Sequence, residues 1–202
     1  MGNKLIVATR NPDKLIELRR ILEAGRVPVD VGDLSEFPDL PEIAETGLTF
    51  TENALIKARA VAAFTGLPAV ADDSGLCADA LNGMPGVLSA RWSGRHGDDD
   101  ANLQLVLGQL ADIPAENRGA QFACAAALVL PSGAEHVTEG LLEGTLTTAP
   151  RGMNGFGYDP IFVPEGAQLT TAEMSPADKD KISHRGRAFR ALAPIIAALL
   201  GS

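Results

Sequence analysis

The chain has 202 residues, of which 46% are hydrophobic and 21% charged, and its 17 Lys and Arg against 26 Asp and Glu give a formal net charge of −9. This length suits one domain with a sizeable core. The negative balance argues against a protein that wraps polymeric nucleic acid, which needs a positive surface to displace counterions, but it is compatible with a small anionic ligand held by local cations or a metal ion.

No segment of the sequence predicts secretion or membrane insertion. The N-terminal apolar run covers only Leu5 to Ala8, and no run approaches the ~20 residues that span a bilayer. Cys77 and Cys124 lack the spacing of a metal or redox motif, so we interpret them as buried free thiols in a reducing compartment. We therefore predict a cytoplasmic protein that binds neither a membrane nor polymeric nucleic acid.

Hydrophobic periodicity predicts strands that alternate with helices. Strands are expected at residues 4–8, 67–71, 122–130, 134–147 and 158–163, and helices from Pro12 on, from Thr49 to Gly66, over 98–112 and over 183–200. The first helix has Asn11 as N-cap, and in the second Thr49 and Glu52 form a capping box. The alternation predicts one α/β domain over residues 1–202, with a mixed central sheet and flanking helices.

Two polar stretches, T-R-N-P-D-K at 9–14 and D-D-S-G at 72–75, follow predicted strands. Ligands of open α/β sheets bind beyond strand ends, so both stretches are candidate ligand sites. Thr9 and Asn11 precede a helix N-terminus, which favours phosphate, and Lys14 adds a cation. The alternative is an ordinary N-cap beside a solvated lysine.

Asp72 and Asp73 stand side by side where a buried strand is expected to stop. One interpretation is a turn, for which Asp, Ser and Gly are suited. The other is a metal site, because adjacent carboxylates repel each other and a divalent cation relieves this repulsion. Oxygen ligands such as Glu45, Asp72 and Asp73 suit Mg²⁺ or Mn²⁺. One aspartate would then orient a water molecule for attack on a phosphate.

Three further stretches carry candidate functional side chains. Asn53 and Lys57 share one helix face, which is either solvated or functional. Glycines flank Phe156 and Tyr158 in G-M-N-G-F-G-Y-D-P-I-F (152–162), so these rings either stack on a base or fold onto the core. His184 and Arg185 begin the last helix, where cations oppose the helix dipole, so we expect them to donate hydrogen bonds to carbonyl or phosphate oxygens.

Taken together, these motifs resemble the inosine-triphosphatase family, the house-cleaning pyrophosphatases of non-standard purine nucleoside triphosphates. The resemblance covers almost the whole chain and rests on T-x-N-x-x-K (9–14), ETGLTFTENALIKA (45–58), ADDSGL (71–76), GMPGVLSARWSG (83–94), GFGYDPIF (155–162) and SHRGRA (183–188). It implies a two-lobed α/β homodimer with the active site in the cleft between the lobes. It also implies hydrolysis of ITP, dITP, XTP or dXTP to the monophosphate and diphosphate with Mg²⁺, or Mn²⁺ as a substitute, which prevents incorporation of these nucleotides into DNA and RNA.

The resemblance also implies roles for individual residues. Asp73 would be the general base, Lys57 would steady phosphate or water, and Glu45, Asp73 and Asp72 would place the metal. The residues that would bind substrate are Thr9, Arg10, Asn11, Pro12, Asp13, Lys14, Ser74, Phe156, Gly157, Tyr158, Asp159, Lys179, His184 and Arg185. Among them, Thr9, Asn11 and Lys14 would hold the triphosphate, whereas His184 and Arg185 would read the 6-oxygen of the base.

Two alternatives remain from the sequence. A related pyrophosphatase for pyrimidine or modified nucleotides would cleave dTTP or UTP, but the S-H-R segment resembles a reader of 6-oxopurines. A non-catalytic purine-nucleotide sensor would not need the acidic residues Glu45, Asp72 and Asp73, all of which are present.

Overall fold

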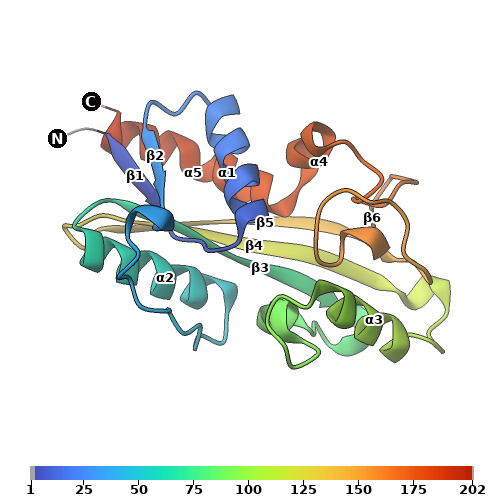
Figure 1. The fold of residues 1–202 in the computed structure, drawn as a ribbon. Coiled ribbons are helices and arrows are strands. Elements are labelled where there is room, and N and C mark those ends of the chain that lie inside the picture. Colours follow the sequence, from blue (N-terminus) through green and yellow to red (C-terminus); the bar gives the residue numbers. More distant parts are fainter. Residues whose placement is uncertain (1–2, 202) are drawn as a thin grey trace. The chain divides into compact units, whose positions relative to one another are not determined.

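The structure is a computed structural model that describes residues 3–201, and Figure 1 labels its elements. The chain divides into two compact units. The first unit comprises the chain up to Asp73, residues 124–140 and the chain from Arg185 on, and the second comprises residues 74–123 and 141–184. The strands β3 (Ala69–Ala78), β4 (Gly119–Val129) and β5 (Glu135–Leu146) contribute residues to both units.

The strands form one six-stranded sheet in the order β2-β1-β3-β4-β5-β6. In the first unit, β1 (Lys4–Val7) pairs in parallel with β2 (Asp30–Asp33) and with β3, with Ile6 opposite Ala69. In the second unit, β5 pairs antiparallel with β6 (Phe162–Pro164). The predicted α/β fold with a mixed central sheet is therefore confirmed.

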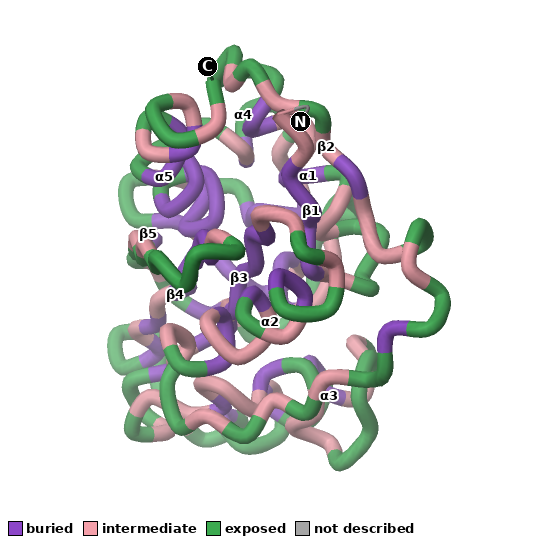
Figure 2. Tube along the Cα trace, turned by 90° about the vertical axis from the view of Figure 1, so that its left-hand side faces the viewer, coloured by how far each residue is buried: buried purple, intermediate pink, exposed green. Residues whose placement is uncertain are grey.

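Helices cover both faces of the strands in the first unit. The helices α1 (Pro12–Ala24) and α5 (His184–Leu200) share a core with one face of β1, and α2 (Phe50–Thr65) packs on the other face (Figure 1). Figure 2 shows β1 and the inner turns of α5 as buried. Each fully buried Leu or Phe in this core contributes roughly 1.5–3 kcal/mol to stability.

The predicted helix starts are confirmed. The side chain of Asn11 accepts hydrogen bonds from the backbone N–H groups of Asp13 and Lys14, and Thr49 and Glu52 form the capping box of α2. Gly66 ends α2 in the left-handed region, with φ of +67°, where residues with a Cβ are disfavoured.

The second unit contains the shorter elements. Besides β6 it has α3 (Asp99–Gln109), α4 (Pro176–Ile182) and the 3₁₀ turns Asp79–Leu81, Gly86–Arg91, Ala115–Asn117 and Asp159–Ile161. Another 3₁₀ turn, Leu34–Glu36, belongs to the first unit. The core of the second unit includes Leu76, Phe122 and Phe162. Within residues 3–201, no helix combines the length and the apolar composition that crossing a bilayer requires.

The structure corrects the prediction that a strand ends before Asp72. Instead, β3 continues to Ala78, so Asp72 and Asp73 lie inside the strand and not in a turn. Gly75 permits this continuation, because a Cβ there would collide with the carbonyl oxygen of Gly86 and the side chain of Ser89. The two aspartates can remain in a buried strand because cationic and hydrogen-bonding side chains from other segments contact their carboxylates.

Other expectations about elements were also wrong. Residues 158–163 form a 3₁₀ turn followed by the short β6 and not one strand, because Pro160 cannot donate a backbone hydrogen bond. The four-residue β2 and the seven-residue α4 were not predicted. Both are too short for an apolar period to develop, and their positions depend on tertiary contacts.

Candidate functional site

The first unit gathers the acidic residues that the sequence singled out, together with three cations. We call this set the carboxylate cluster: Lys14, Glu17, Glu45, Lys57, Asp72, Asp73 and Arg185. Its members come from α1, α2, β3, the first turn of α5 and the loop before α2. Segments far apart in the sequence thus meet beside β3.

Asp72 is buried and balanced by two cations. Its Oδ2 accepts hydrogen bonds from Lys14 Nζ at 3.2 Å and from Arg185 Nε at 3.1 Å. Arg185 is also buried, and its Nη1 donates to Glu17 Oε2 at 2.6 Å. Burial opposes ionisation of Asp72, but Lys14, Arg185 and Lys57 outweigh it and hold the pKa of Asp72 well below its ordinary value.

Asp73 has a different environment on the adjacent position of the strand. Its Oδ1 lies 3.4 Å from Lys57 Nζ, and its Oδ2 accepts a hydrogen bond from Asn53 Nδ2 at 3.1 Å. Lys57 also donates to Glu45 Oε1 at 2.7 Å. Burial raises the pKa of Asp73, and Lys57 and Lys14 offset this effect only in part.

The two neighbouring aspartates therefore have pKa values shifted in opposite directions. Such divergence is typical of catalytic pairs, in which one group remains charged and the other exchanges a proton. Asp72 remains an anion that fixes two cations, whereas Asp73 is the group able to take up a proton. The geometry supports Asp73 as the candidate base and gives Asp72 a task in charge balance.

The stretch before α1 lies at the edge of this cluster. The side chain of Asn11 caps α1, and Thr9 Oγ1 accepts a hydrogen bond from the backbone N–H of Asn11 at 3.2 Å. Arg10 donates to the carbonyl oxygen of Leu40 at 2.7 Å, so its side chain ties down the loop before α2. Of this stretch, Lys14 is the residue whose side chain enters the carboxylate cluster.

Pro12 and Asp13 occupy the first turn of α1 and are exposed. They help to form the helix start, and within residues 3–201 no side-chain hydrogen bond joins them to the carboxylate cluster.

Few side chains of the carboxylate cluster are placed to bind a metal ion. Among residues 3–201, no group of three or more His, Cys, Asp or Glu side chains is arranged to hold an ion by itself. Glu45 and Asp73 contact the same ammonium group of Lys57, so both are within reach of one small cation. The oxygen donors fit Mg²⁺ or Mn²⁺, which normally complete their coordination with water and substrate phosphate. Asp72 fits less well because its Oδ2 is held by Lys14 and Arg185.

The second unit gathers the aromatic loop around a buried carboxylate. We call this set the Asp159 cluster: Phe156, Asp159, Thr171 and Lys179. Asp159 Oδ2 accepts hydrogen bonds from Lys179 Nζ at 2.6 Å and from the N–H of Phe156 at 2.9 Å. Lys179 Nζ also lies 5.0 Å from the centroid of the Phe156 ring, a cation–π distance. Gly155 precedes the ring at φ of +75°, and a Cβ there would strike the Asp159 carboxylate.

The neighbours of Phe156 on this loop have structural contacts. Tyr158 is buried in the core of the second unit, and its hydroxyl donates to the carbonyl oxygen of Ser89 at 2.8 Å. Burial and the nearby Asp99 raise the pKa of Tyr158, which therefore remains neutral. The N–H of Gly157 donates to Asp99 Oδ2 at 2.8 Å, which fixes the loop to the first turn of α3. Tyr158 therefore folds onto the core, which was one of the two alternatives for the loop aromatics, whereas Phe156 is only half-buried.

His184 and Ser74 also belong to the second unit. His184 is 6% exposed, and its ring stacks on Phe122 with centroids 4.8 Å apart and an interplanar angle of 17°. Ser74 follows Asp73 on β3 and is half-buried. Arg185, which the sequence paired with His184 as a reader of the base, donates to Glu17 and Asp72, and its role toward the base stays a prediction.

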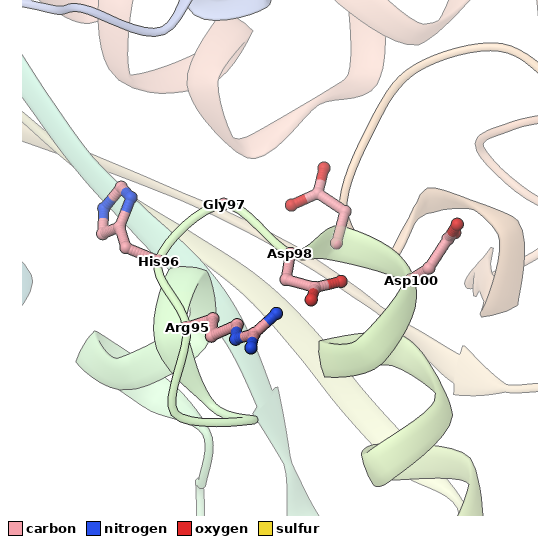
Figure 3. Close-up of a pocket in the computed structure, with 6 residues that line it drawn as sticks. Arg95, His96, Gly97, Asp98 and Asp100 are labelled. Atoms are coloured by element: carbon pink, nitrogen blue, oxygen red, sulfur yellow. The ribbon is translucent and has the colours of Figure 1, made fainter.

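A cavity of about 500 Å³ opens beside the start of α3 and is lined by residues 95–100. Figure 3 shows Arg95, His96 and Gly97 on the loop before the helix, and Asp98 and Asp100 at its start. None of the residues predicted for the site lines this cavity. Asp98 caps α3 by accepting a hydrogen bond from the N–H of Ala101, so this carboxylate is explained by helix formation.

The fold and these groups define an α/β enzyme with a candidate acid–base carboxylate and cations suited to an anionic substrate. Comparison with known proteins makes the class specific. The model of the Ham1 family matches residues 5–195. The chain belongs to the Ham1 family, and the family resemblance read from the sequence is confirmed.

Relatives and solved structures agree over nearly full length. A dITP/XTP pyrophosphatase of Streptomyces coelicolor is 61% identical over 198 residues, which cover 98% of this chain and 99% of the relative. The crystal structure of a nucleoside-triphosphatase (dITP/XTP pyrophosphatase) from Mycobacterium abscessus is 58% identical with a TM-score of 0.77, covering 96% of this chain and 99% of the other. A HAM1 protein from Coxiella burnetii is 42% identical with a TM-score of 0.87, covering 98% and 100%.

The structure adds three residues to the candidate site and gives a contact to Asn53, which the sequence had singled out. Glu17 pairs with Arg185, Asn53 orients Asp73, Asp99 holds the backbone of Gly157 and Thr171 donates to Asp159. The four-residue spacing of Asn53 and Lys57 was a usable signal in the sequence. The other three had none, because each looks like an ordinary helix or loop residue until the chain is folded.

Proposed function

We propose that the protein hydrolyses non-standard purine nucleoside triphosphates, namely dITP, ITP, XTP and dXTP, to the monophosphate and diphosphate. This reaction removes them before they are incorporated into DNA or RNA. The single observation that supports the proposal most is the pair Asp72 and Asp73, whose pKa values are shifted in opposite directions beside Lys14 and Lys57. The nearly full-length relatives, which are named dITP/XTP pyrophosphatases, support the choice of substrate.

The first unit would bind the triphosphate. Lys14 and Lys57 supply positive charge, and the exposed start of α1 adds the positive end of its dipole. Thr9 and Asn11 shape this helix start and would contact the phosphates from it. A phosphate that approaches Lys14 competes with Asp72 for the ammonium group, and Arg185 keeps the charge of Asp72 balanced meanwhile.

Glu45 and Asp73 would hold the metal ion, which we propose to be Mg²⁺, with Mn²⁺ as a substitute. When bound, such an ion offsets charge on the phosphates and helps to bring water to the reacting phosphorus. Asp72 would support this arrangement by its charge. Because Lys57 contacts both Glu45 and Asp73, it keeps the two carboxylates together before substrate binds.

The chemical step would be in-line attack by water on the α-phosphorus. The bond from the water oxygen to phosphorus forms while the bond from phosphorus to the bridging oxygen breaks, and diphosphate leaves. Asp73 takes up a proton from the water. Asn53 holds the Asp73 carboxylate in orientation, and Lys57 and Lys14 stabilise the charge that develops on the leaving diphosphate.

The second unit would bind the base and the nucleoside. Phe156 offers an aromatic surface for stacking, Lys179 offers a donor, and His184 reads the 6-oxygen of hypoxanthine or xanthine. Adenine carries an amino group at this position, so a donor would face a donor. A site built on such polar contacts discriminates by up to ~10⁴–10⁵. The backbone at Gly157, Tyr158 and Ser74 would help to shape the surface that binds the base and the nucleoside.

We also propose that the protein is a cytoplasmic homodimer, on the strength of the family resemblance. Light scattering at micromolar concentration tests the oligomeric state, and a monomeric mass would remove this part of the proposal.

Release of diphosphate tests the function directly. Purified protein with Mg²⁺ is given ITP, XTP, GTP, ATP and dTTP side by side at equal concentration. We expect rapid release from ITP and XTP and little from the others. Release mainly from dTTP would favour a pyrimidine pyrophosphatase, and tight nucleotide binding without release would favour a sensor. Chelation of the metal with EDTA should abolish release, and excess Mg²⁺ should restore it.

A further inference from the structure

The Asp159 carboxylate is buried and has a full set of partners. It is 2% exposed, and its Oδ2 receives the Lys179 ammonium and the N–H of Phe156. Its Oδ1 receives one side-chain donor, the hydroxyl of Thr171, at 2.7 Å. All of these contacts lie within the second unit. A carboxylate enclosed in this way is not directed at substrate, so its effect on substrate passes through the groups that it holds.

Thr171 is itself buried and fixed. It is 1% exposed, and its backbone N–H donates to the carbonyl oxygen of Phe162 at 2.9 Å, which ties it to β6. The hydroxyl therefore approaches Asp159 Oδ1 from a rigid position. Hydrogen bonds to a charged acceptor are short and directional, so this contact sets the rotation of the carboxylate about its Cβ–Cγ bond. That rotation decides where Oδ2 lies and hence where Lys179 and Phe156 are held.

We propose that Thr171 is a positioning residue for base binding, which acts through the Asp159 carboxylate to hold the Lys179 ammonium and the Phe156 ring in place. The inference rests on the proposed function, in which these two groups contact the base. Thr171 itself touches no substrate. Without the hydroxyl of Thr171, the buried Oδ1 of Asp159 loses this donor. The carboxylate then turns toward other donors, and its hydrogen bond with Lys179 is weakened.

The neighbouring Thr170 provides a matched control. It is equally buried, and its hydroxyl donates at 2.8 Å to the carbonyl oxygen of Arg151 at the start of the same loop. Thr170→Val therefore removes one buried hydroxyl and one hydrogen bond that fastens the loop. Thr171→Val also removes one buried hydroxyl, which lies 2.7 Å from Asp159 Oδ1 and 3.2 Å from the backbone carbonyl oxygen of Asp159. The two variants differ in whether the bond lost is one to Asp159.

The experiment measures KM and kcat for ITP hydrolysis with Mg²⁺, and thermal unfolding, for wild type, T171V, T171S and T170V. We expect T171V to raise KM about tenfold and change kcat less than about twofold, because base contacts remote from the phosphorus stabilise ground state and transition state alike. T171S retains a hydroxyl and should return KM to within about twofold of wild type. T170V should raise KM less than about threefold.

A double-mutant cycle tests whether the effect passes through Lys179. Lys179→Met removes the ammonium and should raise KM by itself. If Thr171 acts through Lys179, adding T171V to Lys179→Met should raise KM by less than about twofold more, since coupled residues are not additive. Full additivity would overturn the inference. Thr171→Cys carries a weak donor and should give a KM between those of T171S and T171V, which provides a second readout if T171V fails to fold.

The outcomes separate the inference from the proposed function. A wild-type chain that releases no diphosphate from any nucleotide overturns both. An active wild type with an unchanged KM in T171V, or an equal rise of KM in T170V and T171V, overturns the inference alone. A rise confined to T171V, reversed in T171S and absent from the Lys179→Met background supports it.

Discussion

Two buried aspartates, one in each unit, are stabilised in different ways. Asp72 and Asp159 are almost equally buried, at 3% and 2% exposure. Asp72 is balanced by two cations, Lys14 and Arg185. Asp159 has one cation, Lys179, and otherwise receives neutral donors from Thr171 and Phe156.

The difference fits the part of a nucleotide that we propose each unit binds. A cluster with several charges, some of them partly exposed, can pair with a polyanion, and the carboxylate cluster has such partly exposed groups in Lys14, Lys57 and Glu45. A carboxylate that is fixed by neutral donors holds one lysine and one aromatic ring in place, which suits a flat and nearly neutral base. Four variants, ordered from the largest expected effect to the smallest, test this comparison.

Asp73→Asn tests whether the carboxylate cluster performs chemistry. Asn keeps the shape of the side chain but cannot take up a proton, so we expect kcat for ITP to fall about 10²- to 10⁴-fold, the usual contribution of a general base. Thermal unfolding should show a folded protein. Asp112→Asn changes an exposed carboxylate and should leave kcat unchanged. Turnover of Asp73→Asn within tenfold of wild type would remove Asp73 from the mechanism.

Glu17→Gln tests the balance of charge in the first unit. It leaves the buried guanidinium of Arg185 with one carboxylate fewer, and breaking a buried pair costs about 3–5 kcal/mol of unfolding free energy. Urea denaturation measures this loss. Glu23→Gln, exposed on the same helix, should change the unfolding free energy by less than about 0.5 kcal/mol. A loss below about 1 kcal/mol in Glu17→Gln would show that Asp72 alone compensates Arg185.

Arg118→Met tests whether a buried charge in the second unit is stabilised by neutral hydrogen-bond partners. The buried guanidinium of Arg118 donates to the carbonyl oxygens of Ile113, Thr147 and Leu110. Leaving such acceptors unsatisfied should reduce the unfolding free energy by about 2–3 kcal/mol. The control is Arg151→Met, an exposed arginine of the same unit that also donates to a carbonyl oxygen. If both variants lose equal stability, burial of the guanidinium is not the cause.

Arg59→Ala should have the smallest effect. Arg59 and Glu135 form a bidentate pair at the surface of the first unit, with both N···O distances at 2.7 Å. Exposed pairs contribute about 0.2–1 kcal/mol, and salt screens them. A double-mutant cycle with Glu135→Ala should give a coupling energy in this range that disappears at 1 M NaCl. A coupling above about 2 kcal/mol would mean that surface pairs also matter to this fold.

Much of the fold follows from local sequence. The starts of α1 and α2 were predicted correctly because N-caps and capping boxes are local hydrogen-bond patterns. The α/β class followed from alternating apolar periods. The end of β3 was predicted wrongly, since local rules treat two aspartates followed by Ser and Gly as a turn. The cations that let Asp72 and Asp73 remain in a strand come from other segments.

The candidate site divides in the same way. The sequence by itself determined the family, the residue types and the presence of two adjacent carboxylates, because long motifs and chemical composition are properties of the chain. Only the tertiary structure decided which carboxylate faces which cation. It showed that the pKa values of Asp72 and Asp73 shift in opposite directions, that Arg185 pairs with Glu17, and that Thr171 donates to Asp159. These assignments depend on distances between distant segments and on burial, and both quantities exist only after folding.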